Sequence, residues 1–224
     1  MAYHIDLSTI SIEMYMEKLK KVYLPPSRMI LKEGIDERFT YFTSLGIKNL
    51  GELLQTLKKK DKFNELSKIS LFPGNYLTIL LRELNSMLPK PIKLKDYPGI
   101  SPNTIARLEK AGIKTSLDLF EKLKNRQNRD ELSLKTGISQ DSILELTALS
   151  DLSRIKWTGA VFSRMLYDIG IHSVEKASKA DPVDLHQKIT ILNEDKKYFN
   201  GKIGLKDIIT FVAAAGEVPV EVEY

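Results

Sequence analysis

The residues that most often perform catalysis or bind metals are few and scattered in this chain of 224 residues. Its three histidines, His4, His172 and His186, lie far apart, and none has another histidine one helical turn away, as a helical metal site would. The acidic pairs Asp36–Glu37 and Glu194–Asp195 are typical of charges at helix starts rather than of acid/base catalysts. Cysteine, a P-loop, a dinucleotide-binding glycine motif and a nucleophile elbow are all absent from the sequence. We therefore expect no enzyme, no cofactor and no bound metal.

Two glycine turns are the remaining candidates for binding. The first is the segment Tyr-Pro-Gly-Ile-Ser-Pro at 97–102, which leads into an expected helix from Asn103. The second is Thr-Gly-Ile-Ser at 136–139, which leads into an expected helix from Gln140. What these turns can do depends on the helices that hold them.

An internal repeat defines those helices. A shift of 66 residues aligns two stretches without a gap, and the matched residues include Gly46-Ile47-Lys48 with Gly112-Ile113-Lys114, Leu53 with Leu119, Leu57-Lys58 with Leu123-Lys124, Glu65-Leu66-Ser67 with Glu131-Leu132-Ser133, and Leu80 with Leu146. A further shift of 58 residues brings Leu108 onto Leu166 and Gly112-Ile113 onto Gly170-Ile171. Agreement on this scale indicates copies of one structural unit.

Each copy has the pattern of a helix, a Gly-Ile turn and a second, capped helix. Apolar residues at helical spacing precede each glycine, which is the residue that most readily ends a helix in the left-handed conformation. The next helices have a capping residue at the expected place, namely Asn49, Thr115 and Ser173. The pattern predicts an all-α fold.

The remaining elements also read as helices, apart from the end of the chain. We expect a helix capped by Ser8 or Ser11 that runs to Val22, and further helices at 26–32, 73–87, from Asp181-Pro182 towards Leu192, and at 207–215. The last residues, 218–224, alternate apolar and acidic side chains, which predicts a short extended tail docked as a lone strand. Two prolines in Leu88-Pro89-Lys90-Pro91 indicate a linker. We expect two domains, 1–92 and 93–224.

The positive charge is concentrated in the first domain. The net charge is +5, and residues 1–94 contain 15 Lys and Arg against 10 Asp and Glu, whereas the rest of the chain is balanced. The run Lys58-Lys59-Lys60 contributes to this excess, which attracts nucleic acids or acidic partners but also suits a solvated helix end. Residues 1–11 do not resemble a signal peptide, and no apolar stretch is long enough to span a bilayer. We expect a cytoplasmic protein without membrane contact.

The turn at 97–102, together with Gly112-Ile113, resembles the helix-hairpin-helix motif, whose turn reads Gly-hydrophobic-Gly. Here Ser101 takes the place of the second glycine. The segment 107–119 is also similar to the corresponding stretch of the C-terminal domain of the RNA polymerase alpha chain. Across nearly the whole chain, the order of segments resembles an uncharacterised bacterial family of tandem helix-hairpin-helix-like repeats, including the linker at 88–91, the run at 193–197 and the Val-Glu-Tyr end. This resemblance implies a fold and no established reaction.

The helix-hairpin-helix resemblance implies phosphate binding by the backbone N–H groups of the turn. Carried over to this sequence, the anion site consists of Gly99, Ile100 and Ser101, with a basic residue nearby to neutralise the phosphate. Three residues are open candidates for that charge: Lys95, Arg107 and Lys114. A second and weaker site is formed by Gly137, Ile138 and Ser139.

The other two copies depart from this pattern. In the third copy Trp157 stands where the first glycine belongs, and in the first copy Asp36 and Glu37 follow the glycine and would repel a phosphate. We therefore weigh two hypotheses. The leading one is non-enzymatic, sequence-independent binding of duplex DNA through the turns. The alternative is a protein-interaction scaffold whose hairpins are purely structural.

Overall fold

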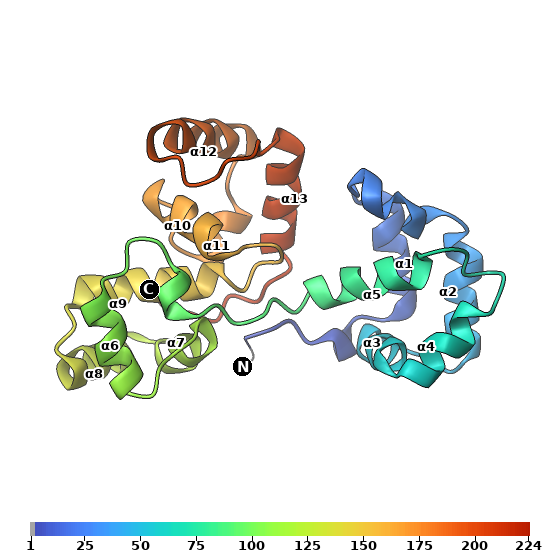
Figure 1. Ribbon diagram of the computed structural model, residues 1–224, viewed down its shortest axis with the longest axis horizontal. Helices are drawn as coiled ribbons and strands as arrows, with labels where there is room; N and C mark the ends of the chain where they lie inside the picture. The colour runs from blue at the N-terminus through green and yellow to red at the C-terminus, as the bar shows by residue number, and fades with distance from the viewer. Residues whose placement is uncertain (1–2) are drawn as a thin grey trace. The chain divides into compact units, whose positions relative to one another are not determined.

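The computed structural model describes residues 3–224, and helices dominate them (Figure 1). Within this range there is no β-strand, and only two isolated bridges occur, between Ser11 and Asn49 and between Lys93 and Thr115. The expected all-α class is confirmed. The chain divides into two compact units, which we call the N-terminal unit (Asp6–Met87) and the C-terminal unit (residues 3–5 with Leu88–Tyr224). This division falls five residues before the boundary expected from the sequence, and residues 3–5 belong with the later part of the chain.

The N-terminal unit is built from short helices. In chain order they are η1 (Leu7–Thr9), α1 (Ile12–Lys21), η2 (Pro26–Lys32), α2 (Ile35–Ser44), α3 (Leu50–Lys58), α4 (Lys60–Ser67) and α5 (Tyr76–Ser86). Ser11 rather than Ser8 caps α1, because its hydroxyl accepts the N–H of Met14 at 3.1 Å. Helix α5 starts three residues later than expected, since Gly74 adopts a left-handed conformation (φ 58°) inside a turn that runs from Pro73 to Tyr76.

Aromatic side chains form the centre of the N-terminal unit. Phe42 and Phe72 stack with their ring centroids 5.1 Å apart, and Phe72 in turn lies 5.7 Å from Tyr76. The guanidinium of Arg38 lies 4.2 Å from the centroid of Tyr76 and donates to the carbonyls of Ile30 and Leu71. An arginine is thus kept in this core because carbonyl oxygens and an aromatic face replace its water.

The C-terminal unit has a longer series of helices. They are η3 (Leu94–Asp96), α6 (Pro102–Lys110), α7 (Ser116–Lys122), α8 (Arg126–Thr136), α9 (Gln140–Leu152), α10 (Ala160–Asp168), α11 (Val174–Ser178), α12 (Pro182–Lys196) and α13 (Leu205–Ala215). One apolar cluster gathers residues from Leu94 to Leu149, and a second gathers residues from Leu152 to Val218. Helix α9 contributes to both, so it is the element around which this unit packs.

The end of the chain is held by backbone contacts and contains no strand. The N–H of Glu223 donates to the carbonyl of Lys124 at 2.8 Å, and Val222 packs with Tyr3 and Phe120. The tail is therefore docked, as expected, but one backbone pair is too little to form a β-ladder.

The Gly-Ile turns have the geometry that the sequence pattern predicts. Gly46, Gly112 and Gly170 lie in the left-handed region, with φ of 80°, 79° and 88°. Each helix that follows is capped by the expected residue, whose side chain accepts the N–H three residues later: Asn49 from Glu52, Thr115 from Asp118 and Ser173 from Lys176. These local predictions are confirmed.

Candidate nucleic-acid interface

The turn at Gly99 is fixed on both sides by buried residues. Gly99 has a φ of 84° and is exposed, whereas Tyr97 before it is buried and its hydroxyl bonds that of Ser153 at 2.5 Å. Burial raises the pKa of Tyr97 above its usual value, so it stays a neutral hydrogen-bonding group. Ile100 packs against the cluster that contains Leu94 and Leu149. The turn is therefore held by the core and presents its glycine to solvent.

Helix α6 begins directly after this turn. The hydroxyl of Ser101 accepts the N–H of Thr104 at 3.1 Å, so Ser101 is the N-cap, and Pro102 occupies the first helical position. The turn is closed by a backbone hydrogen bond between Tyr97 and Ile100, and in the part of the chain that the structure describes the N–H groups of Gly99 and Ser101 donate to no protein acceptor. Neighbouring N–H groups in a turn before a helix can together bind one anion.

Two of the three candidate cations lie on segments that pair with each other. The N–H of Leu94 donates to the carbonyl of Lys114 at 3.0 Å, and Lys93 forms a bridge with Thr115. These contacts place the segment that carries Lys95 alongside the segment that carries Lys114, and both lysines are exposed. Both lysines therefore add positive charge to the face formed by these paired segments, and Lys95 lies four residues before Gly99.

The third candidate, Arg107, contacts the other glycine turn instead. Its guanidinium donates to the carbonyl of Gly137 at 2.7 Å and to that of Thr136 at 3.4 Å. It thereby places a positive charge at the C-terminal end of α8, where the helix dipole favours it. Arg107 joins α6 to α8, a role that its position in the sequence did not indicate.

The turn at Gly137 is more internally bonded than the turn at Gly99. Gly137 (φ 67°) donates its N–H to Ser133 at 2.8 Å, and Ile138 donates to the hydroxyl of Thr136 at 3.4 Å. Ser139 caps α9 by accepting the N–H of Ser142 at 3.3 Å. Since two of the three N–H groups already have partners, this turn has little capacity left to bind an anion.

Arg164, which the sequence did not single out, braces the Gly99 turn from helix α10. Its Nε donates to the carbonyl of Pro98 at 2.8 Å, and its guanidinium atoms lie 3.7 Å from where a side chain on Gly99 would begin. It also pairs with Glu145, and with Asp168 at 3.3 Å. Two carboxylates balance its charge, so Arg164 positions the turn rather than supplying positive charge to it. Sequence reasoning missed it because Arg164 and Pro98 are 66 residues apart.

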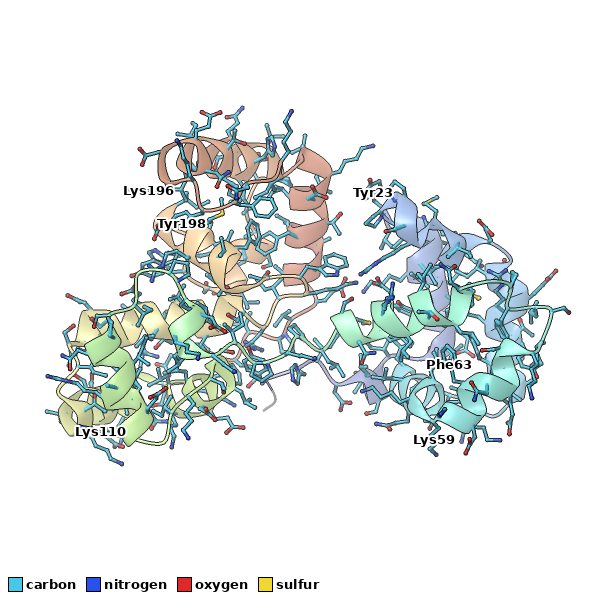
Figure 2. The ribbon with its side chains drawn as sticks, viewed as in Figure 1. Tyr23, Lys59, Phe63, Lys110, Lys196 and Tyr198 are labelled. Carbon is cyan, nitrogen blue, oxygen red and sulfur yellow. The ribbon has the colours of Figure 1, made fainter. Side chains whose placement is uncertain are left out.

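The turn of the first copy has the opposite electrostatic character. Gly34 (φ 52°) precedes α2, and Asp36 and Glu37 lie in the first turn of that helix. The ammonium of Lys20 pairs with Asp36 at 2.5 Å. The carboxylates are thus helix-start charges, as expected, and they leave this turn unsuited to a phosphate. The exposed lysine run at 58–60, with Lys59 labelled in Figure 2, also belongs to the N-terminal unit.

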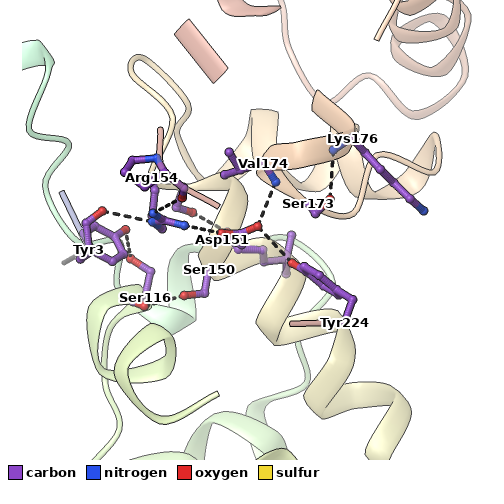
Figure 3. A network of polar contacts seen from close by, with 12 residues as sticks. Tyr3, Ser116, Ser150, Asp151, Arg154, Ser173, Val174, Lys176 and Tyr224 are labelled. Carbon is purple, nitrogen blue, oxygen red and sulfur yellow. Dashed lines mark hydrogen bonds and ion pairs between the residues drawn. The ribbon is translucent and has the colours of Figure 1, made fainter. Parts of the chain in front are cut away.

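A buried polar network in the C-terminal unit is a second feature that the sequence did not reveal (Figure 3). Asp151 and Arg154 form an ion pair at 2.6 Å, with exposed fractions of only 3% and 2%. The other carboxylate oxygen of Asp151 accepts the N–H of Val174 at 2.9 Å and the hydroxyl of Tyr224 at 3.3 Å. Burial raises the pKa of Asp151, even though these partners oppose the shift.

The same network connects the two ends of the chain to helix α9. Arg154 donates to the carbonyl of Tyr3 at 3.2 Å and to that of Pro219 at 2.8 Å. The hydroxyl of Tyr3 bonds Ser116 at 2.7 Å, and burial raises the pKa of Tyr3 to about 12. Although Pro219 and Tyr224 are exposed, the ion pair at the centre of the network is closed to solvent, so we interpret the network as a structural clasp.

Two of the three histidines contact the backbone, whereas His4 packs edge-on against Tyr3 with ring centroids 4.9 Å apart. His172 contacts the carbonyl of Tyr167 at 3.1 Å, and His186 contacts that of Ile203 at 2.9 Å. Across residues 3–224, no three or more histidine and acidic side chains come together in a way that could hold a metal ion. In the same range, no helix combines the length and apolar character that crossing a bilayer requires.

The comparisons with known proteins place the chain in a family defined by sequence. The described residues form an all-α protein. The model of the family described as a domain of unknown function (DUF4332) matches residues 98–218. The chain belongs to this family. The matched region begins at the Gly99 turn and ends at Val218, just after α13. No curated protein and no solved structure matches the chain.

Proposed function

We propose that this protein is a non-enzymatic module that binds the phosphate backbone of DNA without reading its sequence. The observation that carries the proposal is the Gly99 turn, where the N–H groups of Gly99 and Ser101 have no protein acceptor among the described residues. The exposed Lys95 lies four residues before the glycine, and the exposed Lys114 lies on the segment that pairs with Lys93 and Leu94. A phosphate oxygen at the start of α6 accepts these N–H groups and is stabilised by the helix dipole.

We infer further that the turn is a hairpin of the helix-hairpin-helix type. Support comes from the left-handed glycine at its tip, the partly buried Ile100 and the capping Ser101. The matching angles of Gly46, Gly112 and Gly170 support the tandem repeat. Because its proposed ligand is DNA and its sequence contains no cysteine, we propose that the protein is located in the cytoplasm.

Such binding has a characteristic thermodynamic signature. Contacts to phosphates release counterions, so affinity falls as salt rises and differs little between sequences. With a single well-formed turn and two lysines, we expect a dissociation constant for duplex DNA in the micromolar range or weaker at low salt.

The Gly99→Glu variant tests the proposal directly. The carboxylate would stand where the phosphate binds, and we expect the dissociation constant for duplex DNA to rise by about tenfold or more. Fluorescence anisotropy of a labelled blunt duplex at low salt measures this change.

Gly170→Glu is the matched control for this experiment. Gly170 has nearly the same backbone angle as Gly99, 88° against 84°, and lies in the same unit, so both substitutions place a side chain in the left-handed region. We expect Gly170→Glu to bind DNA like the wild type. No duplex binding by the wild type at low salt, or equal weakening by both variants, would refute the proposal and favour a protein-interaction scaffold.

A further inference from the structure

The turn before helix α10 presents the chain's single tryptophan, Trp157. The 58-residue shift that relates the second and third copies places Trp157 on Gly99, and the backbone angles agree, with φ of 66° and 84°. Both residues stand two positions before an N-cap, which is Gly159 for α10 and Ser101 for α6. The third turn therefore keeps the backbone path of the second with a different residue at its tip.

A tryptophan at this position is strained. Side chains with a Cβ rarely adopt a positive φ, and a glycine would hold the same turn without that penalty. Only one other residue besides glycine has a positive φ among residues 3–224, namely Lys197 at the end of α12. Residues held in rare backbone conformations cluster at functional sites, so the outlier points to a use for the indole.

The indole is placed where a ligand can reach it. Trp157 is 43% exposed, and the ammonium of Lys156 lies 4.0 Å from the centroid of its ring. A partly exposed indole with a positive charge over its ring suits an unpaired base, since aromatic rings stack on bases and the cation attracts the adjoining phosphate.

Helix α10 connects this ring to the Gly99 turn. Ala160 and Tyr167 pack against the cluster that includes Ile100, and Arg164 on the same face donates to the carbonyl of Pro98 at 2.8 Å. Arg164 lies five positions after Gly159, which corresponds to about 8 Å along the helix axis. A nucleic acid held at the Gly99 turn can therefore extend to Trp157 within a few nucleotides.

We propose that Trp157 stacks on an unpaired base of the nucleic acid whose phosphate is bound at the Gly99 turn. The ligand class is then DNA with a single-stranded segment adjoining a duplex, rather than a blunt duplex. This inference rests on the proposed function and refines its substrate.

The single tryptophan makes its own fluorescence the probe. The full-length chain is titrated at low salt with a blunt duplex and with the same duplex carrying a short single-stranded overhang, and both tryptophan emission and the anisotropy of a label on the DNA are followed. We expect the overhang to quench the emission and to bind about five- to tenfold more tightly than the blunt duplex. In Trp157→Gly, which keeps the turn with the residue that suits it, the preference for the overhang is lost while the blunt duplex binds as before.

The possible failures can be told apart. If the blunt duplex binds and Gly99→Glu weakens it, but the overhang neither quenches the wild-type emission nor binds more tightly, this inference is wrong and the proposed function stands. If neither DNA binds the wild type, both are wrong. The wild-type emission alone decides the stacking, so the test does not depend on the folding of Trp157→Gly.

Discussion

Replacing Arg154 by methionine lowers the free energy of unfolding of the C-terminal unit by about 3–5 kcal/mol, because it leaves the Asp151 carboxylate buried without its partner. Arg154 is 2% exposed, and its guanidinium also donates to the carbonyls of Tyr3 and Pro219. Methionine fills much of the same volume but satisfies none of these acceptors. The loss therefore comes from polar groups left without partners rather than from a cavity.

Urea denaturation followed by circular dichroism measures this change. The matched control is Lys188→Met, which breaks the exposed Lys188–Asp184 pair at 2.8 Å on α12 and is expected to change stability by no more than about 0.5 kcal/mol. The double variant Asp151→Asn/Arg154→Met is expected to recover part of the loss, since it removes the unpaired charge. A loss below about 1 kcal/mol for Arg154→Met would show that the clasp does not hold this unit together.

Reversing the charge of the two candidate lysines, Lys95 and Lys114, weakens DNA binding strongly. In Lys95→Glu/Lys114→Glu, two attractive contacts with phosphates become repulsive, and we expect the dissociation constant at low salt to rise by about a hundredfold. The dependence of binding on salt should also become shallower, because fewer counterions are released. Anisotropy titrations at several salt concentrations give both quantities.

The control for this variant reverses two exposed lysines elsewhere in the same unit. Lys176→Glu/Lys202→Glu changes the net charge by the same amount, so any effect of overall charge appears in both variants. We expect it to weaken binding by less than about threefold. Equal losses in the two variants would mean that DNA responds to net charge and not to the Gly99 turn.

Features set by neighbouring residues were predictable from the sequence. A glycine that follows apolar residues at helical spacing readily adopts the left-handed conformation that ends a helix. For this reason Gly46, Gly112 and Gly170 all end helices as expected. Capping by Thr115 depends on a side chain and an N–H three residues apart, so it too can be read locally. The predicted start of α5 was wrong, because Gly74, which follows Pro73, delays the helix until Tyr76.

Contacts between distant residues were not predictable. Arg107 was one of three equivalent candidates for the Gly99 turn, but its side chain reaches the carbonyl of Gly137, which only the packing of α6 on α8 decides. Arg164 and the Asp151–Arg154 pair gave no local signal, because their partners come from segments that a single sequence does not bring together. In the sequence, Trp157 departs from the glycine pattern of the turns. Its left-handed backbone and its partly exposed side chain are visible only in the structure.

The most direct measurement follows the backbone amides of the Gly99 turn by NMR while a blunt DNA duplex is added at low salt. If the turn binds phosphate, the amide signals of Gly99, Ile100 and Ser101 shift together and saturate with the dissociation constant found by anisotropy, while the amide of Gly170 stays unchanged. If the duplex binds and these three signals do not move, or if the shifts are confined to the lysine run at 58–60, the Gly99 turn is not the site.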